Sequence, residues 1–452
     1  MIDSGTTAWM LVCTALVLLM TPGLAFFYGG MTRAKSVLNM MMMSFVSIIV
    51  VTVAWVLYGY SLAFDTAGDG TGFVNKIVGG LDYVGLSGVF NAVYEGLIVE
   101  GGSVTAEAAA ADNFPLMVFS AFQLTFAIIT VALISGAIAD RAKFGAWVLF
   151  SLVWATVVYF PVAHWVWGGG WLTQLGIEDF AGGTVVHINA GAAALALALV
   201  LGKRQGWRKE PMRPHNLTLV LLGTGLLWFG WFGFNAGSEL APDQTAGLAF
   251  MNTQVATAVA AGAWLVVEKL RDGHATTLGV ASGAVAGLVA ITPACGFVDP
   301  WAAVVIGVLA GVGCAYAVGL KYRAGFDDSL DVVGVHLVGG LIGAIALGFV
   351  AAYPFLPGQN KGILIEGGQV SQLGLQVLGP VAVGGYSFVM SWIIGKVIDK
   401  TMGFRIGEDA ELTGVDIATH AETGYDLGTV YASGVSSSNG PVISPATKKV
   451  DA

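Results

Sequence analysis

The chain has 452 residues, of which 56% are apolar and only 11% charged, and its formal net charge is −9. Soluble domains carry about 25% charged residues, so this composition excludes a soluble globular protein and indicates that lipid surrounds most of the chain. The three cysteines have no paired spacing, which excludes a disulfide framework and predicts small core residues.

Apolar runs of about 20 residues, the length that spans a bilayer, recur along the whole chain. They predict eleven transmembrane helices at 8–31, 41–64, 114–138, 144–167, 184–201, 216–236, 246–268, 277–293, 301–320, 332–353 and 375–398. The sequence therefore predicts an all-α polytopic membrane protein. Because the first basic residue is Arg33, the first run is expected to be a retained helix and not a cleaved signal peptide.

The predicted helices fall into two blocks of five and a final helix, within a transmembrane domain over residues 1–402. The blocks cover about 8–201 and 216–353 and are separated by the basic connection 202–215. Because each block has an odd number of helices, the second block enters the membrane from the side opposite to the first. This is the inverted-repeat plan of many transporters. The polar tail, 403–452, is expected to be disordered beyond about 426.

Positive charge predicts the orientation of these helices. Of the 20 Lys and Arg residues, only Lys76 and Lys361 lie in connections on one side of the predicted membrane; the others lie on the opposite side. Since cytoplasmic loops are enriched in Lys and Arg, the N-terminus is expected outside and the C-terminus in the cytoplasm. An odd helix count requires the same arrangement.

Two histidines lie inside apolar segments, each eight residues after an aspartate and four residues before a glycine. The two sets, 149 positions apart, are Asp179, His187 and Gly191, and Asp328, His336 and Gly340. Ionisable side chains in a membrane segment are costly and indicate a functional site. Eight helical residues cover about 12 Å, nearly half of a hydrocarbon core of about 30 Å, so the histidines are predicted to meet near the midplane.

The residues alone leave several interpretations of these positions open. Each histidine could bond a backbone carbonyl, or the pair could present a polar edge to a small solute and pass a proton. The carboxylates of Asp179, Asp328 and Asp331 could cap helix starts or brace loops. The histidines could also ligate a haem in a membrane redox enzyme, although the small residues after each histidine favour tight packing over the open volume that haem needs.

Aromatic residues cluster near the outer ends of predicted helices, at 122–127, 164–171 and 231–238. They could form the interfacial belt that is usual for Trp and Tyr. Alternatively, their ring faces could attract a small cation. Phenylalanine is not a typical belt residue, so Phe126 and Phe234 favour the second interpretation.

Several motifs together resemble the ammonium transporter family (Amt/MEP/Rh), and within it the prokaryotic Amt branch. They are PVAHWVWGGG (161–170), DFAGGTVVHIN (179–189), RPHN (213–216), WFGFNAGS (231–238), ITPACG (291–296) and DVVGVH (331–336). The resemblance extends from about residue 8 to 425. It implies a monomer of eleven helices with its own pore, a homotrimer in the plasma membrane, and a transporter with no enzymatic activity, metal or cofactor.

Position by position, the resemblance implies roles for individual residues. It places substrate recruitment at Trp167, Phe126 and Ser238, a gate at Phe126 and Phe234, and pore residues at His187, His336, Trp231 and Thr292. It gives Asp179 a structural or electrostatic role, which we extend to Asp328 and Asp331. Leu337 and Val333 stand where the family often has glycine and phenylalanine, which leaves the packing around His336 open.

The predicted function is transport of ammonium, with methylammonium as an analogue, through a narrow apolar pore. Deprotonation near the phenylalanine gate, passage as ammonia and return of the proton along the histidines would make uptake electrogenic. Two alternatives are an electroneutral channel for ammonia or carbon dioxide and an ammonium sensor acting through the tail. The resemblance also implies a PII-class regulatory protein at residues 403–425, and no nucleic-acid partner is expected.

Overall fold

The computed structural model describes residues 2–66, 70, 72–94, 98–100, 103–105, 114–356 and 359–425. The first half contains α1 (Ser4–Met31), α2 (Val37–Ala54), α3 (Tyr60–Phe64), α4 (Phe73–Ile77), β1 (Ile98–Glu100), β2 (Ser103–Thr105), α5 (Leu116–Ile134), α6 (Phe144–Trp154), α7 (Phe160–Val166), α8 (Trp171–Leu175) and α9 (Asn189–Leu201). The second half contains α10 (Leu217–Ala236), α11 (Gln244–Asp272), α12 (Thr277–Ile291), α13 (Pro300–Ala317), α14 (Leu320–Ala324), α15 (Val338–Val350), α16 (Val370–Thr401), α17 (Glu408–Thr413) and α18 (Val415–His420).

Short 3₁₀ and π-helical turns complete the described elements. The 3₁₀ turns are η1 (Ala34–Ser36), η3 (Val84–Leu86), η4 (Val89–Asn91), η5 (Ser135–Ile138) and η8 (Gly237–Glu239). The π-helical turns are η2 (Trp55–Gly59), η6 (Ala155–Tyr159), η7 (Gly183–Ile188) and η9 (Val333–Leu337). Several π turns continue directly into α-helices, so that α2, η2 and α3 form one rod, as do α6, η6 and α7.

Ten helical segments of the described chain are long and apolar enough to cross a membrane. They are 4–31, 34–64, 116–138, 144–175, 183–201, 217–239, 244–272, 300–324, 333–350 and 370–401. Each overlaps one of the predicted spans. The remaining predicted span, 277–293, corresponds to the shorter helix α12, whose 15 residues rise about 22 Å. The count of eleven crossings stays a prediction.

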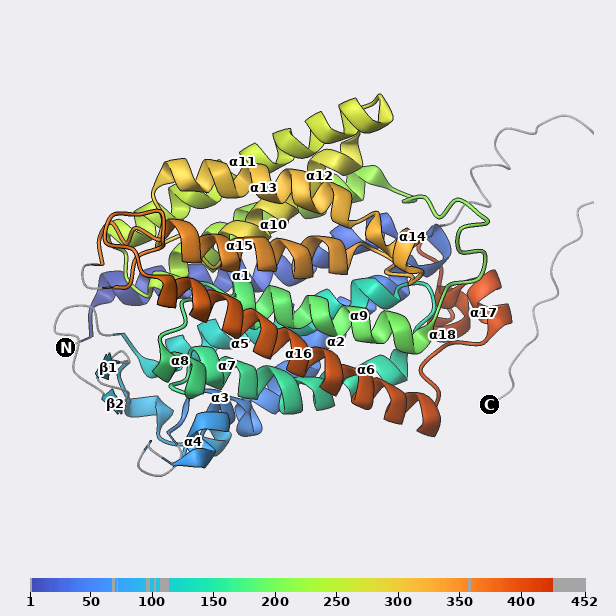
Figure 1. The fold of residues 1–452 in the computed structure, drawn as a ribbon. Coiled ribbons are helices and arrows are strands. Elements are labelled where there is room, and N and C mark those ends of the chain that lie inside the picture. The colour runs from blue at the N-terminus through green and yellow to red at the C-terminus, as the bar shows by residue number, and fades with distance from the viewer. Residues whose placement is uncertain are drawn as a thin grey trace, which may run out of the picture.

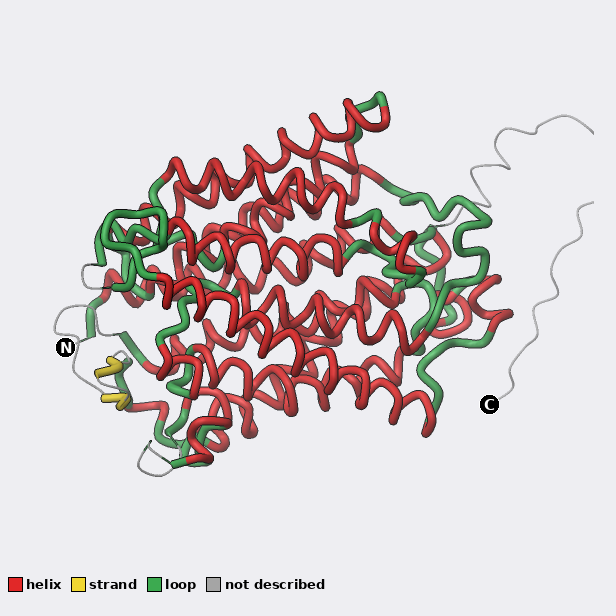
Figure 2. Tube along the Cα trace, viewed as in Figure 1, coloured by secondary structure: helices red, strands yellow, loops and turns green. Residues whose placement is uncertain are grey.

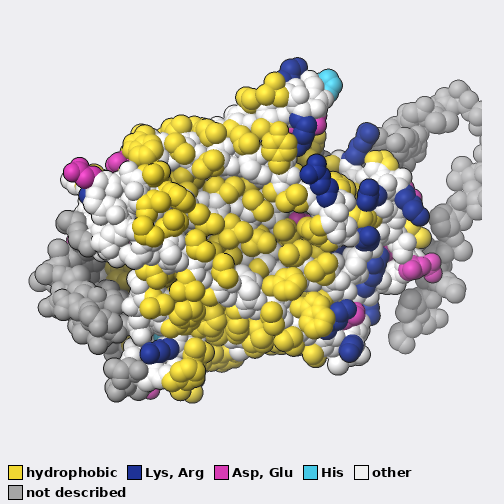
Figure 3. Space-filling view, viewed as in Figure 1, with side chains coloured by type: hydrophobic (Ala, Val, Ile, Leu, Met, Phe, Trp, Pro, Cys, Tyr) yellow, Lys and Arg dark blue, Asp and Glu magenta, His cyan; other side chains and the backbone are white. Residues whose placement is uncertain are grey.

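The long helices run side by side, and the loops gather at the two ends of the bundle (Figures 1 and 2). Helix α1 starts at one end, and α17 and α18 lie at the opposite end. Between the ends, a broad apolar belt covers the visible face, and Lys and Arg side chains gather beside the end that carries α17 and α18 (Figure 3). We call this the basic end. Its arginines include Arg405, which pairs with Glu411 of α17, and Arg33 and Arg204, which share Asp140. Arg323 lies in α14 at the same end.

Glycines allow α1 and α10 to pack with their backbones close together. A Cβ atom on Gly223 would collide with the backbone of Phe27, and one on Gly230 would collide with Met20. Helices α11 and α12 approach in the same way, because a Cβ on Gly287 would lie 2.7 Å from the carbonyl oxygen of Ala256. Small residues at such spacing are how membrane helices gain van der Waals contact without a hydrophobic driving force.

The first part of the tail is folded against the basic end. The carboxylate of Asp416 accepts hydrogen bonds from the backbone N–H groups of Leu38 and Asn39, at the start of α2. Glu411 pairs with Arg405 at 2.7 Å and also accepts from the N–H of Gln205. The region beyond residue 425, where disorder is predicted, lies outside the described residues.

Candidate functional site

A set of buried aromatic rings leads into the bundle from the end opposite the basic end. Phe126 on α5 meets Trp167 edge to face, with ring centroids 5.9 Å apart at 89°. It lies closer to Phe234 of α10, at 4.2 Å between centroids and 38° between planes. Both phenylalanines are almost completely buried. The rings predicted to recruit and gate the substrate therefore lie in contact.

Ser238 lies one helical turn beyond Phe234. Its hydroxyl donates to the carbonyl oxygen of Phe234 over 2.8 Å, and the side chain is half-buried. Because this hydroxyl donates its single hydrogen to the backbone, its oxygen lone pairs remain available as acceptors. A solute with N–H donors would suit this group better than a carbonyl or carboxylate would.

The two histidines meet in the middle of the bundle. The Nδ1 atoms of His187 and His336 lie 3.3 Å apart, and the ring centroids are 5.3 Å apart with the ring planes at 26°, so the two imidazoles meet edge to edge. The His187 ring also lies nearly parallel to the rings of Trp231 and Phe234, with centroids 5.3 and 6.1 Å away. Nε2 of His187 is buried and has no hydrogen-bond partner among the described residues.

Both histidines line a small cavity whose other walls are apolar or aromatic. Its free volume is about 10 Å³. The lining residues are Met20, Leu24, Phe27, Ile129, Leu133, His187, Leu227, Trp231, Phe234, Val285 and His336. A space of this size holds about one water-sized molecule. A bare cation inside it would lose its hydration with only neutral imidazoles in return.

Each histidine lies in a π-helical turn. His187 is in η7 and His336 in η9, and both turns continue into regular helices, α9 and α15. A π turn widens the helix by one residue and is found frequently at functional sites. The matched turns bring the two imidazoles together from the two halves of the chain.

Asp179 holds the start of η7. Its Oδ1 accepts from the N–H groups of Gly182 and Gly183, and its Oδ2 accepts from Thr184 and Val185, at 2.7–3.0 Å. Burial raises the pKa of Asp179 to about 6, although these four donors act in the opposite direction. The carboxylate is thus mainly ionised at neutral pH.

The carbonyl oxygen of Asp179 accepts a hydrogen bond from Trp167 Nε1 at 2.9 Å. One residue therefore links the outer tryptophan to the turn that carries His187. The Asp179 carboxylate caps the backbone N–H groups at the start of η7, in the geometry that helix N-termini favour.

Asp328 occupies the corresponding place before η9. Its carboxylate accepts from only two N–H groups, those of Val332 and Val333, at 3.1 and 2.8 Å. Asp331 differs, since its carboxylate pairs with Lys321 at 2.6 Å. Asp331 thus braces the loop through an ion pair.

The glycines four residues after the histidines pack against the opposite histidine segment. A Cβ on Gly191 would lie 2.5 Å from the backbone nitrogen of Leu337, and one on Gly340 would lie 2.9 Å from Ile188 Cγ1. Ile188 and Leu337 directly follow the two histidines, so the contacts are reciprocal. Leu337 meets Gly191 through its backbone and Cβ, and its side chain is half-buried.

Thr292 lies behind the cavity wall. It accepts a hydrogen bond from Trp231 Nε1 at 2.8 Å and donates to the carbonyl oxygen of Leu288 at 2.7 Å. It is not among the residues that line the cavity. Thr292 therefore contacts the cavity through Trp231, and its predicted role in the pore stays a prediction.

Replacing Thr292 by valine should reduce ammonium-evoked current several-fold without preventing folding. Valine has a similar shape but no acceptor, so the indole N–H of Trp231 would be left unpaired at a cost of about 1–3 kcal/mol, and the ring would reorient. Current in proteoliposomes and thermal unfolding would be measured. Thr224→Val is the matched control, since that hydroxyl bonds only to Val220 of its own helix. Equal currents in both variants would contradict this role.

The basic end contains a buried ion network that could not be predicted from the sequence. Arg204 pairs with Asp327 at 2.9 Å and with Asp140 at 3.1 Å, and Asp140 also pairs with Arg33. Arg141 is fully buried and donates to the carbonyl oxygen of Asp327. The only sequence signal was the occurrence of charged residues beside predicted helix ends, which is also typical of solvated loops.

This arrangement agrees with comparisons to known proteins. The sequence profile of the Ammonium Transporter Family matches residues 8–425. The chain belongs to the ammonium transporter family. A protein of Mycobacterium tuberculosis named ammonium transporter is 56% identical over 95% of this chain and 92% of its own length, and one of Bacillus subtilis is 45% identical over 93% and 98%.

Solved structures of the family are also similar to this chain. Mep2 of Candida albicans aligns over 90% of this chain and 87% of its own, with a TM-score of 0.80 and 34% identity. A structure described as a sensor Amt protein aligns over 92% and 98%, with a TM-score of 0.80 and 27% identity. This is a family of transporters and not of enzymes. The prediction from the motifs is confirmed: the protein is a multi-pass protein of the plasma membrane, and its family supports ammonium transport.

Proposed function

We propose that the protein carries ammonium to the ring pair of Phe126 and Phe234, passes it onward as ammonia, and returns the proton along His187 and His336. The observation that carries this proposal is the contact between two imidazoles in a cavity that is otherwise apolar or aromatic. Uptake by this route moves net charge inward.

Recruitment is supported by the chemistry at the outer end. The faces of Trp167 and Phe126 attract a small cation with about 0.5–2 kcal/mol each, depending on desolvation. The lone pairs of Ser238 can accept an N–H from the bound ion. Together they replace part of the hydration shell that ammonium loses on entry.

Selectivity follows from the step after the gate. Potassium is similar in size to ammonium, so a pore diameter cannot separate the two ions. Ammonium can lose a proton and continue as a neutral molecule, whereas potassium would have to enter the cavity as a bare charge. The closely packed rings of Phe126 and Phe234 are the barrier at which that difference takes effect.

Proton return is supported by the geometry of the histidine pair. A neutral imidazole has one donor and one acceptor nitrogen, so only one proton lies between the two Nδ1 atoms. Nε2 of His187, which has no partner among the described residues, is available to the substrate. A proton taken up on one ring can thus leave from the other.

The topology belongs to the same proposal. Eleven crossings, with the N-terminus outside and the basic end in the cytoplasm, agree with the positive-inside rule. The matched π turns, caps and reciprocal glycines support two inverted repeats over about 8–201 and 216–353, with 375–398 as the final crossing. We extend the proposal to a homotrimer and to a PII-class regulator that binds over α17 and α18.

The proposal is tested by ammonium pulses on proteoliposomes that contain the purified protein. We expect a current with ammonium and none with potassium or sodium at the same concentration. Internal pH, followed with a trapped dye, would be recorded in parallel. Ammonia entry without current would instead establish an electroneutral channel. Binding of ammonium without either signal would favour a sensor acting through its tail.

A further inference from the structure

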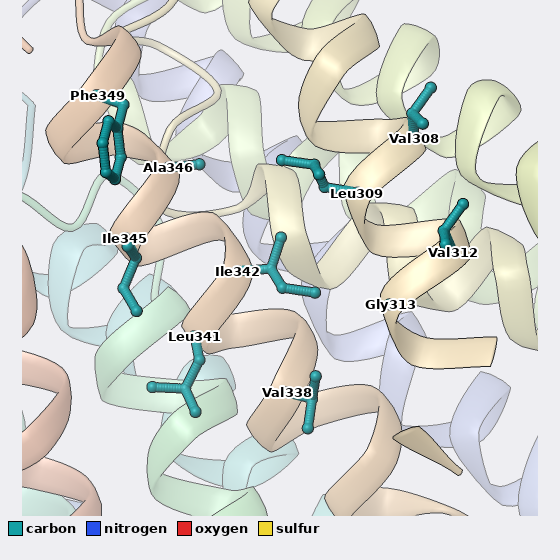
Figure 4. A pocket seen from close by; sticks show the side chains of 10 residues that line it. All are labelled: Val308, Leu309, Val312, Gly313, Val338, Leu341, Ile342, Ile345, Ala346 and Phe349. Carbon is teal, nitrogen blue, oxygen red and sulfur yellow. The ribbon is translucent and has the colours of Figure 1, made fainter. Parts of the chain in front are cut away.

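Polar groups that the transport route does not use lie at the end of the bundle opposite the basic end, beside α8 (Figure 1). They do not belong to the groove of about 590 Å³ between α13 and α15, which is lined by apolar side chains and one glycine (Figure 4). That groove offers no side-chain hydrogen-bond partner to a polar solute. The groups beside α8 are a carboxylate and two unpaired oxygen atoms.

Glu178 supplies the carboxylate and directly precedes Asp179, in the segment between α8 and η7. Its side chain is half-buried, and the described residues supply neither an ion-pair partner nor a hydrogen bond to this carboxylate. Burial, and then the charge of Asp179, raises the pKa of Glu178 to about 8. The titratable groups that face it in the described chain are Asp179 and the phenol of Tyr353. Neither can balance a negative charge on Glu178.

Helix α16 packs against this segment and supplies the first unpaired oxygen. A Cβ atom on Gly379 would collide with Ile177 Cδ1, so the helix and the segment are in close contact. Gln376, nearly one turn earlier on α16, is fully buried, and its Nε2 donates to the backbone carbonyl oxygen of Glu178 over 3.0 Å. Its Oε1 is buried and has no partner among the described residues. Since both atoms belong to one amide group, the unpaired oxygen lies beside Glu178.

The segment that follows α15 supplies the second unpaired oxygen. The ring of Tyr353 lies 5.0 Å from that of Phe297, which in turn lies 5.0 Å from that of Phe180, two residues after Glu178. The Tyr353 hydroxyl interacts electrostatically with Glu178, and it is buried without a hydrogen-bond partner in the described part of the chain. Buried polar groups normally have such a partner, so two unpaired oxygens beside one carboxylate indicate a ligand.

We propose that Glu178, Gln376 and Tyr353 form a second ammonium site. None of the three lines the histidine cavity. All three can accept hydrogen bonds, and ammonium can donate one N–H to each. Hard metal cations generally take about six or more oxygen ligands, a larger set than these residues provide. The bound ammonium replaces the proton of Glu178, which leaves to water, so the site stays neutral.

The site is connected to the pore through the backbone. Glu178 is bonded to Asp179, whose carboxylate accepts from the four N–H groups at the start of η7. An ion held at Glu178 therefore stabilises the segment that leads to His187 without itself crossing the membrane. Binding here requires that ammonium reaches the outer end of the protein, and it does not depend on the route of the proton.

The test uses thermal unfolding of the full-length protein in detergent, with ammonium, potassium or sodium chloride at equal concentration. Glu178→Gln removes the carboxylate but keeps the shape of its protonated form, and Gln376→Leu removes the amide oxygen. Glu366→Gln, which removes an exposed carboxylate from the loop before α16, is the matched control for charge. The recruitment residues are unchanged in every variant, so their contribution to ammonium binding is the same. Unfolding without ammonium shows that each variant is folded.

In wild type and Glu366→Gln, we expect the apparent dissociation constant for ammonium to fall about tenfold from about pH 6.5 to about pH 7.5, because ammonium competes with one proton. Ammonium itself stays protonated over this range. Glu178→Gln should lose this dependence, and Gln376→Leu should bind ammonium several-fold more weakly at the higher pH.

Equal stabilisation of wild type by potassium or sodium would overturn the assignment to ammonium. So would ammonium stabilisation that is the same in wild type and Glu178→Gln, which would leave water as the occupant. If Glu178→Gln does not fold, Gln376→Leu decides, since ammonium binding equal to that of Glu366→Gln would overturn the site as well.

Discussion

Replacing Asp179 by asparagine should abolish ammonium transport and destabilise the protein. The carboxylate accepts from four backbone N–H groups, two on each oxygen. An amide keeps one oxygen and turns its NH₂ group toward two of these donors, which become unpaired at about 1–3 kcal/mol each. The start of η7 would shift, and with it His187 and the hydrogen bond from Trp167 to the backbone of Asp179. Current in proteoliposomes and thermal unfolding in detergent would be measured.

Asp328→Asn provides the matched comparison. Asp328 caps the other histidine segment with one N–H on each oxygen, so its amide leaves only one donor unpaired. We therefore expect Asp328→Asn to lose about half as much stability as Asp179→Asn, and less of the ammonium current. If Asp179→Asn unfolds at the wild-type temperature, the cap does not hold η7. If it is stable but inactive, the charge of Asp179 itself acts on the substrate.

The meeting of the two histidines could be predicted because it depends only on spacing and membrane thickness. Asp179 and His187 recur as Asp328 and His336, and eight helical residues reach nearly half of the hydrocarbon core. The predicted contact between His187 and His336 agrees with the 3.3 Å between their Nδ1 atoms. The long apolar helices were predictable for the same reason, since burial in lipid requires unbroken hydrophobic runs.

The exact wall of the cavity could not be predicted. A π turn depends on one inserted residue in the hydrogen-bond ladder, and residues such as Val185 and Val335 carry no signal for it. Family position suggested that Thr292 lies near the pore, but only the geometry places it behind Trp231. The partners of Arg204 and Arg141 are brought together by the fold from segments more than sixty residues apart.

Replacing both histidines by alanine should remove the ammonium current and leave ammonia entry. Without imidazoles, the described residues that line the cavity include no group that accepts a proton. Ammonia is neutral and small, so it can still pass through a cavity that is lined by apolar side chains. We expect the current to fall by about 100-fold or more, the effect of losing a positioned proton-transfer group. The dye inside the vesicles should then report alkalinisation, because ammonia would enter without its proton.

Single variants decide whether the two rings act as one unit. If a proton must cross the 3.3 Å between the Nδ1 atoms, the loss of either ring interrupts the proton path. His187→Ala and His336→Ala should then each lose about as much current as the double variant. Additive losses would mean that each ring acts alone.

Leu227→Ala controls for volume, because Leu227 lines the same cavity and its truncation enlarges the space without touching either imidazole. This variant should keep most of the current. A current in the double variant equal to that of Leu227→Ala would exclude the histidines as the route of the proton. Loss of both current and alkalinisation would instead mean that the imidazoles are needed to keep the passage open for ammonia itself.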